Sequence, residues 1–143
     1  MTVRIVVSAC LLGENCKYNG KNNFDPLLCE ALNEHEVLPV CPEVLGGLSV
    51  PRCPCEIVGG AVMNKNGENV DSQFRSGAAK AVKIALENGA QLAVLQPRSP
   101  SCGVGEIYDG SFSGTKIKGD GIFARALAAA GIKAVTPKEF LDI

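Results

Sequence analysis

Short apolar runs alternate with longer amphipathic segments along this chain. Four apolar runs are typical of buried parallel strands, and they cover residues 3–9, 36–41, 90–96 and 132–136. Between these runs, residues 24–35, 71–89 and 120–131 have the apolar spacing of amphipathic helices. Each of these segments has Asp or Pro near its start, as helices commonly do. This alternation predicts a doubly wound α/β fold in which a mostly parallel sheet of about four strands is flanked by helices.

Two stretches outside this pattern, residues 42–70 and 99–119, are rich in Gly and Pro. The "NKNG" sequence at residues 64–67 favours a tight turn, so we expect a small hairpin insertion around it. The chain has no internal repeat and no linker, and its 143 residues with 46% hydrophobic content suffice for one core. We therefore expect residues 1–143 to form a single domain.

The charge pattern indicates a small-molecule partner. Basic and acidic residues are interspersed and the formal net charge is -1, which is typical of neither a nucleic-acid-binding nor a membrane-binding protein. No run approaches the ~18 apolar residues of a membrane span, and the N-terminal residues lack the features of a signal peptide. We expect a cytoplasmic protein without a nucleic-acid or membrane partner, and the sequence leaves the oligomeric state unassigned.

The seven cysteines suggest chemistry beyond packing. Their odd number and the lack of an export signal favour a metal or catalytic role over disulfides. Cys10 follows the first predicted strand, Cys41 ends the second, and Cys102 lies six residues beyond the third. Because ligands of parallel sheets bind beyond the carboxyl ends of the strands, we expect these three to converge, with Cys16 as a fourth candidate. Cys29, on the apolar side of a predicted helix, is expected to pack in the core.

The spacing of the cysteines bears on which metal they would hold. Structural zinc sites usually contain a CxxC-type pair, whereas the closest pair here, Cys53 and Cys55, is separated by one residue. Thiolates from scattered loops commonly bind iron–sulfur clusters, and small residues in "SACLLG" and "SPSCG" leave room for inorganic sulfides. On spacing alone, an iron–sulfur cluster and a set of unpaired thiols both remain open.

Several blocks of sequence carry a family resemblance. In order they are "VSACLLGENCKYNG", "VCPEVLGGLSVPR", "FRSGA", "SPSCG" and "IYDGSFSG", and they span about residues 5 to 131. Together they resemble the thiouracil desulfurase family. The resemblance implies an α/β enzyme with a [4Fe-4S] cluster that removes sulfur from a thiolated nucleobase or nucleoside without net redox change.

The resemblance also implies a ligand set. The cysteines of its motifs are Cys10, Cys41 and Cys102, with Cys16 as the alternative to Cys41. Three thiolates on four irons leave one iron with an exchangeable position, where a soft thiocarbonyl sulfur can bind. Water would then attack the ring carbon, and the sulfur would leave as sulfide. The chain departs from the family pattern at Cys53 and Cys55, and at Gln96, where a lysine is common.

Three further side chains are candidate catalytic residues. Glu43, two residues after Cys41, is the candidate base that takes a proton from water, and the hydroxyls of Ser99 and Ser101 are candidates to orient the substrate. Alternatively, Glu43 caps a turn and Ser101 bonds a backbone N–H. Arg98 is favoured over Arg52 as an anchor for a substrate oxygen.

A second function remains open from the sequence. The alternative is a zinc-binding or redox-sensing module in which some of the cysteines bind zinc or form a disulfide, without catalysis. The colour of the protein purified without oxygen would separate the two, because an iron–sulfur protein is brown and a zinc protein is colourless.

Overall fold

A four-stranded parallel sheet organises the computed structural model, which describes residues 2–142. Its strand order is β2-β1-β5-β8, and the strands are β1 (Arg4–Ser8), β2 (Glu36–Val40), β5 (Leu92–Val94) and β8 (Lys133–Val135). Neighbouring strands are parallel throughout. The predicted doubly wound α/β fold is confirmed, with each strand inside its predicted range.

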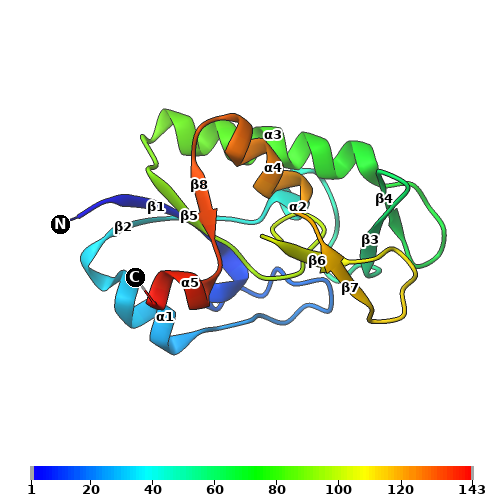
Figure 1. The fold of residues 1–143 in the computed structure, drawn as a ribbon, viewed down its shortest axis with the longest axis horizontal. Helices are drawn as coiled ribbons and strands as arrows, with labels where there is room; N and C mark the ends of the chain where they lie inside the picture. The colour runs from blue at the N-terminus through cyan, green and yellow to red at the C-terminus, as the bar shows by residue number, and fades with distance from the viewer. Residues whose placement is uncertain (1, 143) are drawn as a thin grey trace.

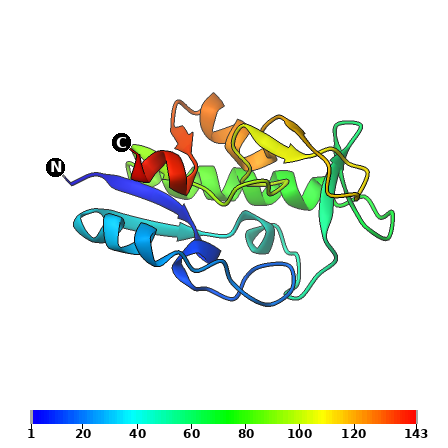
Figure 2. The same cartoon turned by 60° about the horizontal axis from the view of Figure 1, so that its bottom comes forward.

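Helices cover both faces of the sheet (Figures 1 and 2). One face carries α3 (Asp71–Glu87) and α4 (Ile122–Ala129), and the other carries α1 (Pro26–Ala31) and α5 (Pro137–Leu141). Successive residues of β1 serve the two faces in turn: Val6 packs toward α3 and α4, whereas Ile5 and Val7 pack toward α1. This double burial explains why the strands have continuous apolar sequences rather than alternating ones.

Short elements complete the chain. The 3₁₀ helices η1 (Ala9–Leu12) and η2 (Leu32–Glu34) follow β1 and α1, and the one-turn helix α2 (Pro42–Leu45) follows β2. The predicted helix 24–35 is therefore shorter than its pattern and ends in 3₁₀ geometry. Among residues 2–142, no helix is long and apolar enough to cross a bilayer.

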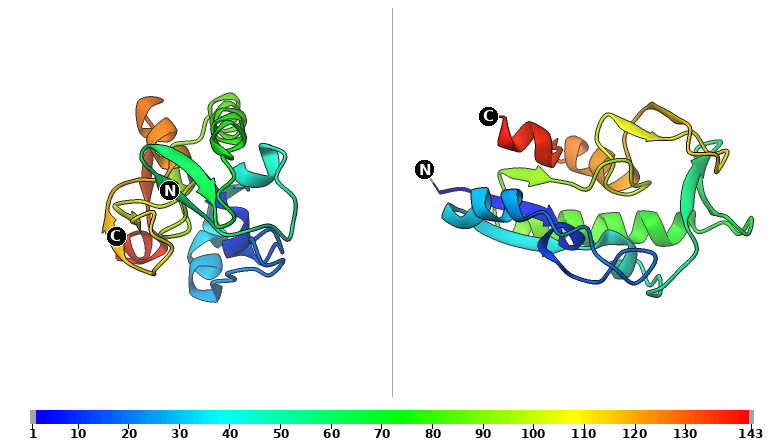
Figure 3. Two further views of the ribbon diagram at one scale, coloured as in Figure 1. Left: turned by 90° about the vertical axis from the view of Figure 1, so that its right-hand side faces the viewer. Right: turned by 90° about the horizontal axis from the view of Figure 1, so that it is seen from below.

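Two hairpins lie at the end of the molecule opposite the termini (Figure 3). They are β3 (Cys55–Val58) with β4 (Ala61–Asn64), and β6 (Glu106–Tyr108) with β7 (Lys116–Lys118). The expected hairpin near residues 64–67 exists, but Gly59 and Gly60, both with positive φ, make its connecting turn. Residues 64–67 form a second turn, in which the Gly67 N–H donates to the Asn64 carbonyl at 3.0 Å. The β6–β7 hairpin was not predicted.

Two glycines bring α2 against α3. A Cβ atom on Gly77 would lie 1.7 Å from the Pro42 carbonyl oxygen, and one on Gly46 would lie 2.0 Å from the Gln73 carbonyl oxygen. No other residue type allows this approach. The Gly of the "FRSGA" block therefore sets the position of α2, and with it the residues just after β2.

Candidate active site

A cavity of about 540 Å³ opens at the carboxyl ends of β1, β2 and β5. Its volume is in the range of small-molecule sites. The loops that follow these three strands line it, and the two hairpins contribute further residues. Five cysteines are among the lining residues: Cys10, Cys16, Cys41, Cys55 and Cys102. The structure thus brings together the three cysteines predicted to converge and the alternative, Cys16.

Local backbone features place these thiols. Cys10 lies in η1, which ends at Gly13 with φ 97°. Cys41 is the N-cap of α2, with Pro42 in the first helical position. Cys102 lies in a turn held by the Ser99 hydroxyl, which accepts hydrogen bonds from the N–H groups of Ser101 (3.1 Å) and Cys102 (3.0 Å).

Burial and contacts between the cysteines shift the pKa values of their thiols. A hydrogen bond from the Cys16 thiol lowers the pKa of Cys41 to about 7, and the same contact raises the pKa of Cys16. Burial raises the pKa of Cys10 and of Cys102. The Cys41 thiol also faces the Cys16 carbonyl oxygen at 3.8 Å, so these two cysteines lie side by side at the cavity.

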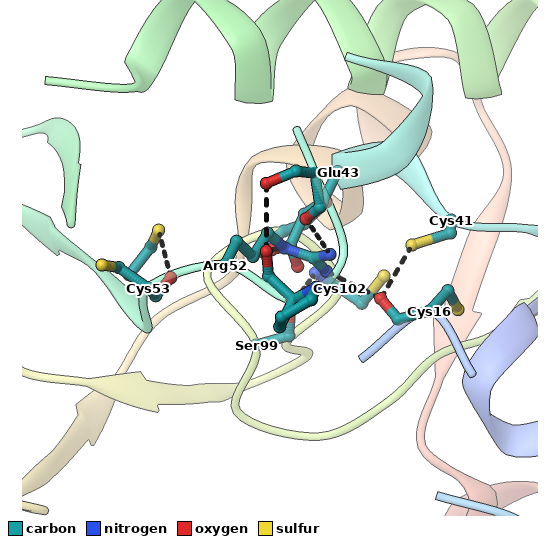
Figure 4. Close-up of polar contacts among 11 residues, drawn as sticks. Cys16, Cys41, Glu43, Arg52, Cys53, Ser99 and Cys102 are labelled. Atoms are coloured by element: carbon teal, nitrogen blue, oxygen red, sulfur yellow. Dashed lines mark hydrogen bonds and ion pairs between the residues drawn. The ribbon is translucent and has the colours of Figure 1, made fainter. Parts of the chain in front are cut away.

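A buried ion pair stands beside the thiols (Figure 4). Arg52 Nε donates to Glu43 Oε1 at 3.1 Å, and the two side chains are 7% and 17% exposed. The same guanidinium donates to the Ser49 carbonyl (3.1 Å) and to the Cys16 carbonyl (2.9 Å). Burial raises the pKa of Glu43, while the charge of Arg52 opposes that rise.

This ion pair revises the expected roles of the arginines. Arg98, favoured from the sequence, lines the cavity, but its side chain is 42% exposed and pairs with Glu106 at 3.8 Å. The guanidinium of Arg52 is already committed to three protein acceptors. Arg52 therefore positions Glu43 and the Cys16 loop. No local pattern signals this, because Arg52 and Cys16 lie far apart in sequence.

The two candidate serines differ in their surroundings. The hydroxyl of Ser99, which lines the cavity, accepts two backbone N–H groups and keeps its own proton available. Ser101 is fully buried, and no described residue hydrogen-bonds its hydroxyl. The turn-capping role considered for Ser101 thus belongs to Ser99. Ser101 is not among the residues that line the cavity, so of the two candidate serines only Ser99 faces it.

Comparison with known proteins identifies the family. A family model described as 2-thiouracil desulfurase matches residues 5–139. This chain belongs to the 2-thiouracil desulfurase family. The family resemblance predicted from the sequence blocks is confirmed.

Two relatives of this desulfurase are similar over nearly their whole length. The uncharacterized protein YbbK of Bacillus subtilis (strain 168) is 40% identical, over 97% of this chain and 99% of YbbK. A solved structure described as the [4Fe-4S]-dependent thiouracil desulfidase TudS superposes with a TM-score of 0.91 at 36% identity, over 98% of this chain and 94% of that one. The cofactor named for TudS is the one that the family resemblance implied for this chain.

The donor set of this desulfurase-family chain fits such a cluster. Five cysteines, with Cys55 at the margin, line one cavity, and thiolates are the usual ligands of iron–sulfur clusters. Within residues 2–142, no three His, Cys, Asp or Glu side chains are placed to hold a single metal ion. A cluster places its thiolates on separate irons, so it accepts more widely spaced sulfurs than one ion does. The zinc alternative therefore gains no support from the described residues.

The remaining cysteines lie at the margin or outside this site. The Cys55 side chain lines the cavity from the β3 side, and burial raises its pKa to about 12. The Cys53 sulfur accepts a hydrogen bond from Asn66 Nδ2 at 3.2 Å. The expectation that Cys29 packs in the core is wrong, because this residue is only half-buried on α1. Its thiol lies 3.7 Å from the Leu11 carbonyl oxygen.

Proposed function

We propose that this protein is a [4Fe-4S]-dependent desulfurase that converts a thiolated nucleobase, such as thiouracil, into the corresponding oxo base. The observation that carries the proposal is the joint presence of Cys10, Cys16, Cys41 and Cys102 with a buried Glu43–Arg52 pair in one cavity. Membership of the 2-thiouracil desulfurase family supports the substrate class. A cytoplasmic location, and the lack of nucleic-acid and membrane partners, stay predictions.

Cys10, Cys41 and Cys102 are the proposed ligands of the cluster. They follow three adjacent strands of the parallel sheet, so the sheet itself holds their spacing. When bound, the cluster supplies a Lewis acid to the thiocarbonyl sulfur at the iron that carries no cysteine. Cys16 lies beside Cys41 and is the alternative third ligand.

Glu43 is the proposed general base. The hydrogen bond that the described residues give its carboxylate goes from Arg52 to Oε1, which leaves Oε2 to take a proton from the attacking water. Burial makes the carboxylate a stronger base than one in water, because the desolvated charge is less stable. Arg52 keeps the carboxylate in one orientation and limits that effect.

Ser99 and Ser101 are the proposed hydrogen-bond donors. The Ser99 hydroxyl has accepted two N–H groups, so its O–H is free to orient the ring of the substrate from the cavity wall. The Ser101 hydroxyl, which no described residue pairs, is the proposed donor toward the group held by the neighbouring Cys102.

The net reaction needs no electron donor. One water is consumed and one sulfide is released, while the carbon exchanges its double bond to sulfur for one to oxygen at constant oxidation state. Glu43 receives the proton of the attacking water and returns it to the departing sulfide or to the ring. The oxo base and sulfide form in equal amounts.

The test is anaerobic purification followed by an assay with 2-thiouracil. The protein is expected to be brown, to contain iron and sulfide, and to form one sulfide per uracil without added reductant. Colourless protein that binds zinc stoichiometrically would favour the alternative module. A requirement for reductant in every turnover would overturn the hydrolytic reaction.

A further inference from the structure

The loop between β6 and β7, residues 109–115, contributes Phe112 and Gly114 to the cavity wall. Phe112 and Tyr108, from this hairpin, line the cavity that the cysteines line. Phe112 has φ 56°, in the left-handed region that a bulky residue rarely adopts. Such a conformation persists only where the surrounding structure holds it.

A buried carboxylate from the other hairpin holds this loop. Glu56, on β3, is 9% exposed, and its Oε1 accepts hydrogen bonds from the N–H groups of Gly110 (3.0 Å) and Phe112 (3.1 Å). Bonds from N–H groups to an ionised oxygen are stronger than neutral ones. These two hydrogen bonds therefore hold the backbone of residues 110–112 in the conformation that includes the positive φ of Phe112.

The approach of the loop to β3 is also specific. Gly110 has φ 94°, and a Cβ atom there would lie 2.6 Å from the Ile57 carbonyl oxygen. The glycine lets the loop lie directly on β3, within reach of the Glu56 carboxylate. The "YDG" and "SFSG" parts of the sequence block thus act together with a residue more than fifty positions earlier.

We propose that Phe112 forms an aromatic wall on which the planar ring of the thiolated base stacks, and that Glu56 is the positioning residue that keeps this wall in place. The inference rests on the proposed function and deepens it, because it assigns the recognition of the ring. Stacking depends on a planar π-face and little on which base presents it. The wall therefore selects heteroaromatic thiocarbonyl compounds over acyclic ones.

The wall is tested by the pair 2-thiouracil and thiourea, which share the N–C(=S)–N unit while only the first has a ring. Phe112→Leu is expected to raise KM for 2-thiouracil about ten-fold, the order that one base–aromatic stack contributes, with kcat little changed. Phe112→Tyr is expected to restore KM. Thiourea turnover is expected to be the same in both variants and in the wild-type protein.

A binding measurement adds a readout besides turnover. Uracil lacks the sulfur but keeps the ring, and calorimetric titration of the cluster-loaded protein is expected to show about ten-fold weaker uracil binding in Phe112→Leu. Phe24, which is 55% exposed, offers the matched control, and Phe24→Leu is expected to keep wild-type affinity.

The positioning role of Glu56 has its own variants. Glu56→Ala leaves the two N–H groups without their acceptor, so it is expected to raise KM for 2-thiouracil as Phe112→Leu does. Glu56→Gln keeps an amide oxygen and is expected to recover most of the loss. Equal iron content in all variants verifies that the cluster site is intact.

The outcomes separate this inference from the proposed function. Wild-type KM and uracil affinity in Phe112→Leu, or an equal loss with thiourea, would overturn the aromatic wall and leave the desulfurase assignment standing. A protein that binds uracil through Phe112 but releases no sulfide would overturn the proposed function and leave the wall standing.

Discussion

Gly77→Ala tests whether the contact between α2 and α3 positions the active site. The new Cβ would lie 1.7 Å from the Pro42 carbonyl oxygen, whereas real Cβ atoms essentially never approach another atom within 3.0 Å. The helices must therefore separate by more than about 1 Å. Both sides of this contact are backbone, so no side chain can rotate away.

The magnitude follows from two opposing effects. In an open helix, replacing Gly by Ala stabilises by roughly 1 kcal/mol through helix propensity. Overpacking of a close contact costs about 1–3 kcal/mol, and a backbone clash of this size lies at the upper end. We expect a net loss of about 2 kcal/mol in the free energy of unfolding.

The functional effect is expected to be larger than the loss of stability. Cys41 caps α2 and Glu43 lies within it, so a retreat of α2 moves a proposed ligand and the proposed base together. Misplacement of reacting groups by about 1 Å can lower the rate ~10²-fold. We therefore expect lower iron content and a fall in kcat of that order.

The measurements are urea unfolding followed by circular dichroism, iron analysis, and turnover of 2-thiouracil under anaerobic conditions. Ser76→Ala is the matched control, because Ser76 is the exposed neighbour on α3 and the change alters only helix propensity. A Gly77→Ala protein that is as stable as wild type and fully active would refute the reasoning.

Three further predictions concern the side chains of the site. Cys10→Ser, Cys41→Ser and Cys102→Ser are each expected to abolish iron binding while Cys29→Ser keeps it, and full iron in Cys41→Ser with loss in Cys16→Ser would move the third ligand to Cys16. Glu43→Gln is expected to keep the brown cluster and lower kcat ~10²–10⁴-fold because an amide cannot accept the proton; unaltered kcat would remove Glu43 from the reaction. Arg52→Met leaves the buried Glu43 carboxylate unpaired and is expected to lower the free energy of unfolding by about 3–5 kcal/mol in urea. Glu43→Gln in the Arg52→Met background is expected to recover part of this loss, and additive losses of the two changes would contradict the pairing.

The sequence by itself determined the architecture and which three cysteines meet at one edge of the sheet. Strand and helix periods are local signals, so the four apolar runs and the helical segments between them were sufficient for a parallel α/β sheet. Topology then placed the residues that follow the strands at one edge, which brought Cys10, Cys41 and Cys102 together in prediction and in the structure. Sequence blocks in a recognisable order supplied the family.

Only the tertiary structure decided how these parts hold one another. The pairing of Cys16 with Cys41, the hydrogen bond of Arg52 to the Cys16 carbonyl, and the hydrogen bonds of Glu56 to the Phe112 loop join residues distant in the chain. Such contacts leave no period in the sequence, because they depend on how separate elements pack. The same is true of Gly77. In the sequence it is only a glycine inside a predicted helix, whereas the structure shows that the Pro42 carbonyl leaves no room for a Cβ atom there.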